Sequence, residues 1–252
     1  MRLRLRPKPS IATNRRPRGG SADRRARATV LTTWLRQGLR SGICPLCRVA
    51  HKADREYIWH FFDEGADQGE SIDAVRAACG FCHEHIEMLA RIEIEGMRST
   101  LAISVLFADT FTGLVADLDG LSSQSEFRRA PCPACANRDE RVAVNAEYLL
   151  DELATSPGHR KRFETSPGLC FAHFELVWEL AQTVEEREFL RRVQRDAADR
   201  LLAALTDHVR KHDHRFRGEP KGPERDSWQR AIFMTAGWPA PVESAAEPEA
   251  RS

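Results

Sequence analysis

The feature that most constrains the fold is an internal repeat of cysteine and histidine positions, offset by 88 residues with no gap. Each copy reads C-P-x-C followed by G-x-C-x-x-H, and 34 residues separate its second and third cysteines. Chance can supply one C-x-x-C string, but two complete sets in register indicate a duplicated structural unit. The sets are Cys44, Cys47, Cys82 and His85 in the first copy, and Cys132, Cys135, Cys170 and His173 in the second.

Three sulfurs and one imidazole per copy form a ligand set suited to zinc. Zn²⁺ binds four such ligands tetrahedrally, with Zn–S near ~2.3 Å and Zn–N near ~2.0 Å. Protein side chains fill all four positions, which favours a structural site, because a catalytic zinc keeps one position open. The repetition disfavours the simpler hypothesis that these cysteines are buried thiols that bind no metal. The sequence therefore predicts eight metal ligands and two zinc ions per chain.

The local geometry of both elements supports this prediction. In C-P-x-C, a tight turn is expected to direct both sulfurs at one point. In G-x-C-x-x-H, the glycine permits a sharp entry into a helix whose first turn carries Cys and His at i and i+3, on one face. The helix dipole favours a thiolate at such a cysteine.

The grouping of the ligands is less determined. We expect one tetrahedral set per repeat, which requires Cys44 and Cys47 to share an ion with Cys82 and His85. The sequence leaves open whether the sets close within each copy or exchange across copies. In either case the long spacer must contain folded structure, so metal loss is expected to unfold at least one half of the chain.

Residues 79–85, CGFCHEH, permit other interpretations. Cys79 to His83 is the string that attaches a c-type haem, and Cys79 with Cys82 resembles a redox dithiol. Only Cys82 and His85 recur in the second copy, which disfavours both. An iron–sulfur cluster is the main competing cofactor for a Cys3His set. Cys79 is interpreted as a small apolar packing residue.

Helical periodicity covers most of the chain, and no segment predicts a confident strand. The predicted fold is all-α, with two tandem zinc-clamped helical repeats packed as one helical domain. The predicted helices span 28–41, 47–65, 72–79, 82–95, a long segment ending at Asp119, 136–154, 159–164, 170–182, 184–211 and 225–236.

Several of these helices carry apolar residues that we expect to face the core. In the last helix these are Trp228, Ile232 and Phe233, and in the helix ending at Asp119 they are Leu101, Val105, Ala108, Phe111, Leu114, Val115 and Leu118.

Charge is distributed unevenly. Residues 1–27 hold ten Arg or Lys and one acid, for a net charge of +9, which leaves −8 on the remainder. With Pro, Gly and Ser and few apolar residues, this basic arm is predicted to be disordered. The predicted organisation is a disordered basic arm at 1–27, a first zinc-binding repeat at 28–121, a second at 122–216, a linker and docking helix at 217–238, and a disordered tail at 239–252.

Neither a secretory signal nor a membrane span is predicted. No apolar core follows the arginines of the arm. The most apolar stretch, 101–118, is interrupted by Asp109 and Asp117. We therefore expect a cytoplasmic protein with no membrane contact, in which seven cysteines indicate metal or redox use rather than disulfides.

Other histidines are not interpreted as ligands. His208 and His212 have the i, i+4 spacing of a metal pair, but the first copy has no equivalent, and the helix dipole already favours imidazoles near a helix C-terminus. His51 and His60 also lack counterparts and are interpreted as surface or packing residues.

The repeated strings resemble an uncharacterised bacterial family of unknown function. That family is similar in its paired CPxC and GLCxxH elements and in a closing tryptophan helix, and the resemblance extends over about residues 28–238. It implies no established activity. The strings that carry it are CPLC at 44–47, GFCHEH at 80–85, CPAC at 132–135, GLCFAH at 168–173 and SWQRA at 227–231.

Three functions are compatible with these features. One is a zinc-stabilised interaction or regulatory module for an unknown protein partner. A second is a thiol-based redox or zinc-release sensor, with Cys79 as a resolving thiol. A third is nucleic-acid binding through the arginines of residues 2–27, although no aromatic residues accompany them and the body is acidic. No catalytic triad, phosphate loop or H-E-x-x-H motif predicts an enzyme.

Overall fold

The computed structural model describes residues 33–40, 42–63, 69–92, 101–123, 129–216 and 218–238. Within these ranges the regular elements are helices and there is no strand, which confirms the predicted all-α class. Residues 1–27 and 239–252, predicted to be a disordered arm and tail, lie outside the described residues. The helices are a segment at 33–38, α2 (Pro45–Asp63), α3 (Gly69–Ala77), α4 (His83–Arg91), α5 (Leu101–Asp119), α6 (Pro133–Thr155), α7 (Pro157–Thr165), α8 (Phe171–Leu180), α9 (Val184–Arg210) and α10 (Ser227–Ala236).

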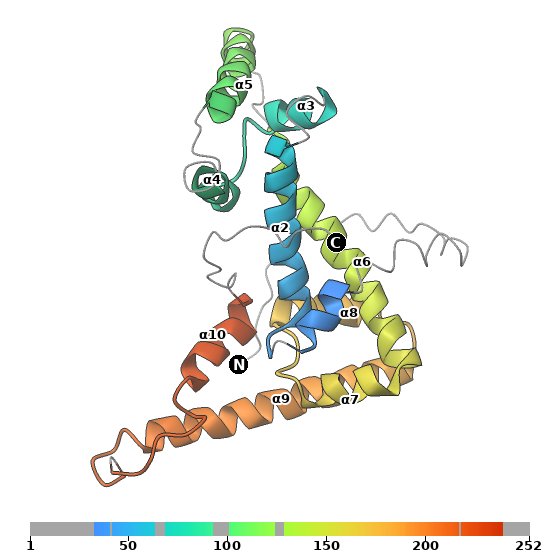
Figure 1. Cartoon of the computed structure of the whole chain (residues 1–252), viewed down its shortest axis with the longest axis vertical. Coiled ribbons are helices and arrows are strands. Elements are labelled where there is room, and N and C mark those ends of the chain that lie inside the picture. The colour runs from blue at the N-terminus through green and yellow to red at the C-terminus, as the bar shows by residue number, and fades with distance from the viewer. Residues whose placement is uncertain are drawn as a thin grey trace.

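Helices α2 and α6 pack against each other and run in opposite directions at the centre of the molecule (Figure 1). The start of α6 lies beside the middle of α2, where Asn137 Nδ2 is 3.5 Å from the carbonyl oxygen of Ala53. Each helix therefore begins near the end of the other, and near the segments that follow that end. This arrangement positions the two groups of predicted ligands.

The largest hydrophobic core lies around the start of α2 and the end of α6. It joins these helices to the segment 33–38 and to α7, α8 and α9 through side chains that are almost fully buried. Burying each such side chain stabilises the fold by about 1.5–3 kcal/mol. Its largest fully buried side chains are Leu35, Leu46, Leu149, Phe163, Leu169 and Leu190.

The opposite end of the α2–α6 pair carries α3, α4 and α5 over much smaller cores (Figure 1). One is built on Ile58, Leu89 and Ala134. Another is built on Phe61, Val75 and Leu106. The two ends of the molecule therefore differ in how much apolar surface they bury.

The predicted inward face of α5 is wrong. Val105, Phe111 and Val115 are exposed, whereas Leu106 and Thr110 are buried. Because α5 is apolar around most of its circumference, periodicity alone did not identify the side that packs.

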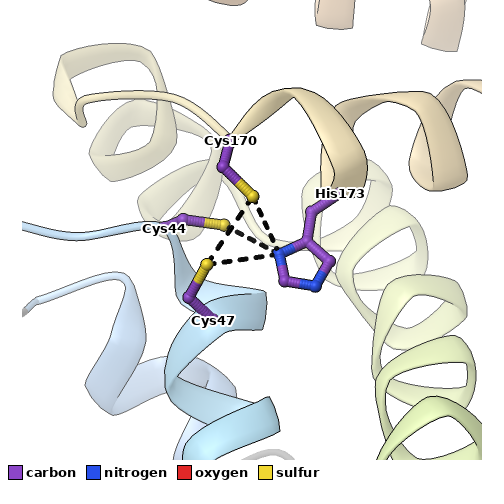
Figure 2. A group of neighbouring side chains, drawn as sticks. All are labelled: Cys44, Cys47, Cys170 and His173. Carbon is purple, nitrogen blue, oxygen red and sulfur yellow. Dashed lines mark hydrogen bonds between the residues drawn. The ribbon is translucent and has the colours of Figure 1, made fainter. Parts of the chain in front are cut away.

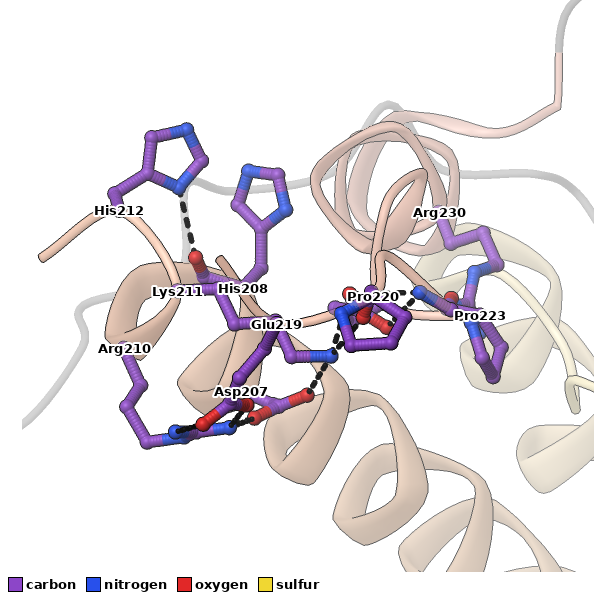
Figure 3. A network of polar contacts seen from close by, with 11 residues as sticks. Asp207, His208, Arg210, Lys211, His212, Glu219, Pro220, Pro223 and Arg230 are labelled. Atoms are coloured by element: carbon purple, nitrogen blue, oxygen red, sulfur yellow. Dashed lines mark hydrogen bonds and ion pairs between the residues drawn. The ribbon is translucent and has the colours of Figure 1, made fainter. Parts of the chain in front are cut away.

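The C-terminal segment returns along α9 and is fixed by a polar network (Figure 3). Lys211 Nζ lies 2.9 Å from Glu224 Oε1, 3.1 Å from Asp207 Oδ2 and 2.9 Å from the carbonyl oxygen of Pro220. The Glu224 carboxylate is buried and also accepts the amide hydrogen of Gly222 at 2.9 Å. We call the contacts of Glu224 with Lys211 and Gly222 the C-terminal latch. It anchors the segment predicted as a linker directly before α10.

Helix α10 docks by only part of the predicted face. Phe233 packs on the main core as predicted, and Met234, which was not predicted, is buried. Trp228 and Ile232, which we expected to dock, are about half exposed.

Candidate metal centres

The structure gathers the eight predicted ligands into two clusters. In each, one ligand atom per residue lies within 4.8 Å of all the others. We call them site one, formed by Cys44, Cys47, Cys170 and His173, and site two, formed by Cys82, His85, Cys132 and Cys135.

The expected grouping of one set per repeat is wrong, because each site combines the C-P-x-C of one copy with the C-x-x-H of the other. The antiparallel packing of α2 and α6 explains the exchange. Cys44 and Cys47 begin α2, and so lie beside the segments that follow the end of α6, which include α8. By the same relation, the cysteines that begin α6 meet α4.

The ligand atoms of site one converge on a single point (Figure 2). Nδ1 of His173 faces three sulfurs, at 3.4 Å from Cys44, 3.4 Å from Cys47 and 3.2 Å from Cys170. The sulfurs of Cys47 and Cys170 are 3.6 Å apart.

Site two repeats this geometry. Nδ1 of His85 lies 3.1 Å from the sulfur of Cys82, 3.6 Å from that of Cys132 and 3.4 Å from that of Cys135. The sulfurs of Cys82 and Cys135 are 3.6 Å apart.

These separations fit a tetrahedral metal ion. A Cys3His zinc site with ordinary bond lengths places its ligand atoms roughly 3.5–3.8 Å from one another. The measured separations are within a few tenths of an ångström of this range in both sites. The residues present therefore fit the metal that their chemistry implies.

The C-P-x-C strings are not the tight turns that we expected. Helices α2 and α6 begin at Pro45 and Pro133, two or three residues before the predicted starts. Proline suits the first helical position because its fixed φ is already helical and its missing N–H has no intrahelical partner there. Cys44 and Cys132 thus precede the helices, and Cys47 and Cys135 lie in their first turns.

The G-x-C-x-x-H strings behave as predicted, with one shift in the helix start. Gly80 and Gly168 have φ of 104° and 78°, a region that favours glycine. A Cβ at Gly168 would lie 2.8 Å from Oε1 of Gln194, so this position also needs the space. Cys82 and Cys170 occupy the N-cap positions of α4 and α8 rather than their first turns.

Site one lies within the main core and is closed by the end of the described chain. Cys44, Cys47 and Cys170 are at most 4% exposed. The backbone N–H of Trp238 donates to the sulfur of Cys47 at 3.4 Å. Nε2 of His51 donates to the carbonyl oxygen of Trp238 at 2.6 Å, so His51 holds this closing residue in place.

Site two has partly exposed sulfurs and a polar support instead. Nε2 of His85 donates to Oδ1 of Asp54 at 2.8 Å, and both side chains are buried. This contact fixes the ring and leaves Nδ1, which faces the three sulfurs, as the nitrogen that would bind a metal ion. Arg138 Nη1 lies 3.6 Å from Oδ2 of Asp54 and balances its charge.

In site one, the titration of the ligands reflects their mutual contacts. Burial raises the pKa of the Cys44 thiol well above its usual value, and hydrogen bonds with Cys170 and Cys47 raise it further. Hydrogen bonds with Cys44 and Cys47, and then with His173, stabilise the Cys170 thiolate and lower its pKa. Burial opposes the imidazolium of His173, but contacts with Cys170 and Cys47 outweigh it and raise its pKa to about 9. Metal binding must therefore displace a proton from His173.

Site two shows the same pattern, with Asp54 added. Burial opposes ionisation of Cys82, yet hydrogen bonds from His85 and Cys135 lower its pKa to about 7. Burial, followed by the contact with Cys82, raises the pKa of Cys135 to about 12. Burial disfavours the imidazolium of His85, but Asp54 and Cys82 raise its pKa to about 9.

The remaining sequence candidates lie outside both sites. Cys79 belongs to neither cluster, is partly exposed and has φ of 52°. The rings of His208 and His212 are 4.5 Å apart, and Nδ1 of His212 donates to the carbonyl oxygen of His208. No third ligand joins them among the described residues.

Sequence reasoning missed two supporting groups. Asp54 has Val142 as its counterpart 88 residues later, so the repeat did not point to it. Asp54 also lies in a polar stretch, HKADRE at 51–56, so its position carried no signal of its own. The Trp238 amide had no signal, because any residue except proline supplies a backbone N–H.

The fold and the sites define an all-helical protein with two candidate Cys3His metal centres. Residues 107–240 match the sequence profile described as "Family of unknown function (DUF6062)", and the chain belongs to this family. The resemblance to a family of unknown function is thereby confirmed. The match includes the second-copy ligands and begins after those of the first copy. Comparison with curated proteins and with solved structures gave no match.

None of the helices in the described ranges combines the length and the apolar character needed to cross a membrane.

Proposed function

We propose that the protein is a zinc-binding helical module in which two structural zinc ions fasten the two halves of the chain together. The proposal rests on one observation: each site takes two ligands from each predicted repeat. A metal ion in site one would thus bridge segments more than 100 residues apart in the sequence. A metal ion in site two would bridge segments about 50 residues apart.

The ligand chemistry supports zinc in a structural role. Three thiolates and one imidazole in a tetrahedral arrangement are typical of zinc and of some iron–sulfur centres. All four positions are filled by protein, so no position remains for a water or a substrate. We therefore propose an interaction or regulatory role for the folded helical surface, with an unknown protein partner, rather than a reaction at the metal.

Elemental analysis of the purified full chain tests this proposal. We expect two zinc ions per chain and no stoichiometric iron. Two double variants test the exchanged grouping. Cys44→Ser with Cys170→Ser damages site one alone and should retain one zinc. Cys44→Ser with Cys82→Ser damages both sites and should lose most of the metal.

The opposite result for the double variants would mean that each set closes within its own copy. A metal-free wild-type chain that keeps its helical circular dichroism and its unfolding midpoint would overturn the structural role. Iron with visible charge-transfer absorption would replace zinc by a cluster.

A redox or zinc-release sensor is the second candidate, favoured by the partial exposure of Cys82, Cys132 and Cys135 in site two. Hydrogen peroxide can oxidise one thiolate to a sulfenic acid with release of hydroxide. A second thiolate then displaces hydroxide to form a disulfide, and the zinc ion loses two ligands if both cysteines are ligands, or one if the second is not. Cys79, three residues before Cys82, is a candidate for that second thiol.

Timed peroxide treatment with a zinc-sensitive dye distinguishes this candidate. Site two should release its zinc first, and Cys79→Ser should slow that release while leaving site one unchanged. Equal resistance of both sites would exclude the sensor.

A further inference from the structure

Helix α5 carries a stripe of apolar residues on the outside of the molecule. Val105, Phe111, Val115 and Leu118 are 62%, 57%, 55% and 51% exposed, and Ala108 is also exposed. We call these residues, together with Leu101 at 70% exposure, the α5 stripe. They recur every three or four positions and so share one side of the helix.

The opposite side of α5 is already used. It packs on α3, with Leu106 and Thr110 buried. Asp109 pairs with Arg76 of α3 at 2.6 Å. The helix contains no basic residue, and its only other charges are Asp117 and Asp119 near its end. A helix that is apolar around most of its circumference is usually buried on all sides, whereas only one side of α5 is buried.

The area of the stripe is sufficient for a specific contact. Each large side chain exposes on the order of 100 Å², so the stripe exposes roughly 500 Å², as much as the largest patch on a typical monomer. Two such stripes pressed together bury roughly 1,000 Å², the lower limit for a specific protein interface.

The order of residues in the stripe indicates the occupant. Read forward, the stripe runs Leu, Val, Ala, Phe, Val, Leu. Read backward, it runs Leu, Val, Phe, Ala, Val, Leu, so the two orders differ only at the two central residues. In an antiparallel pair of α5 helices, Val105 therefore meets Val115 of the second copy. At the centre, Ala108 meets Phe111 of the second copy, so a large side chain lies over a small one. Such self-complementarity is the property of a twofold interface between identical chains.

The charges favour the same arrangement. In an antiparallel pair, Asp117 and Asp119 of one copy lie about a helix length, roughly 28 Å, from those of the second copy. In a parallel pair the four carboxylates would meet and repel one another.

We propose that the protein forms a homodimer in which the α5 stripes of two chains pack antiparallel around a twofold axis. The α5 stripe includes no ligand of either candidate metal site, so the proposed dimer does not depend on the proposed zinc role.

Sedimentation velocity of the full chain, as purified, tests the proposal. The chain has a mass of 28.5 kDa, and the wild type should sediment as a dimer at about 10 μM, a concentration at which micromolar affinity suffices. Val105→Arg places a charge opposite an apolar side chain and should weaken association at least about 100-fold. Leu202→Arg is the matched control, because Leu202 is also 62% exposed but lies on α9.

A second pair of variants tests the antiparallel register. Val115→Asp alone should also give monomers. The double variant Val105→Arg with Val115→Asp should dimerise again, because each arginine then faces an aspartate of the second copy. In a parallel pair the arginines would face each other, and no rescue would occur.

Helical circular dichroism and metal content should be unchanged in all of these variants, since the substituted side chains are exposed. A monomeric wild type overturns the proposal and leaves a different protein, or another segment of this chain, as the occupant of the stripe. A dimer that survives Val105→Arg, or one that Leu202→Arg dissociates equally well, also overturns it.

Discussion

Sites one and two have the same ligand types in nearly the same geometry, but the protein supports them differently. The sulfurs of site one are buried in the main core, and a backbone amide donates to one of them. The sulfurs of site two are partly exposed beside a much smaller core, and a buried carboxylate holds its histidine.

The difference shows that one tetrahedral arrangement can be held by packing or by polar contacts. At site one, neighbouring helices restrict the ligand side chains. Loss of a metal ion there would disrupt the packing of the main core around the three buried cysteines. At site two the sulfurs are partly exposed, and the buried hydrogen bond from His85 to Asp54 fixes the orientation of the imidazole. We therefore expect site one to control global stability and site two to control a local region.

The largest effect should come from removing the second cysteine of each C-P-x-C string. Cys47→Ser should reduce the free energy of unfolding by about 4 kcal/mol or more, because it opens a buried site in the main core. Cys135→Ser, its counterpart, should cost about 2 kcal/mol, because α4 and its small core can separate while the rest stays folded. Urea unfolding followed by circular dichroism measures both.

Each variant should retain about one zinc ion, which shows that the two sites load independently. Equal losses of stability, or a larger loss for Cys135→Ser, would contradict the expectation that site one controls global stability and site two only a local region.

A smaller effect should follow from Asp54→Asn, which keeps the shape and one acceptor oxygen but removes the charge. Loss of such a carboxylate partner typically weakens metal binding 10- to 100-fold, and we expect about 10-fold at site two. Competition with a chelator measures the affinity of each site, and site one of the same variant is the internal control. Equal weakening of both sites would show that Asp54 acts on the whole fold rather than on His85.

The sequence was sufficient to predict the eight clustered Cys and His residues but not their grouping. The eight positions follow from spacing alone, because a repeat of C-x-x-C and C-x-x-H is local information. Which copy completes which site depends on the antiparallel packing of α2 and α6, a long-range contact with no local signature.

The same limit explains the errors at α5 and Asp54. Periodicity places Leu106 and Val105 on different sides of a helix but does not say which side packs when both are apolar. Asp54 lies on α2, and its partners His85 and Arg138 lie on α4 and α6, so its role appears only when three helices meet. The all-α class was predictable, since it needs only the helical pattern.

The smallest effect tests whether the closure of site one depends on contacts distant from the metal. Helix α10 follows the C-terminal latch, and Trp238 after α10 covers Cys47. Hydrogen bonds from Gly222, followed by the ion pair with Lys211, lower the pKa of Glu224 to about 2. The ionised latch therefore stabilises the fold at neutral pH and is lost only as pH falls below the unfolded-state value towards 2.

Glu224→Gln should loosen the latch without removing its volume. We expect zinc to leave site one faster by less than about fivefold, because Lys211 keeps its ion pair with Asp207 and the amide oxygen of the variant side chain can still accept from Gly222. Site two should be unchanged. Glu188→Gln is the matched control, since Glu188 also pairs with a basic residue on α9, Arg191, but lies away from α10. Stopped-flow transfer of zinc to a chelator measures both rates. If Glu224→Gln instead accelerates loss from site two, or if Glu188→Gln matches it at site one, then the latch does not control the cover over Cys47, and site one is held by its core alone.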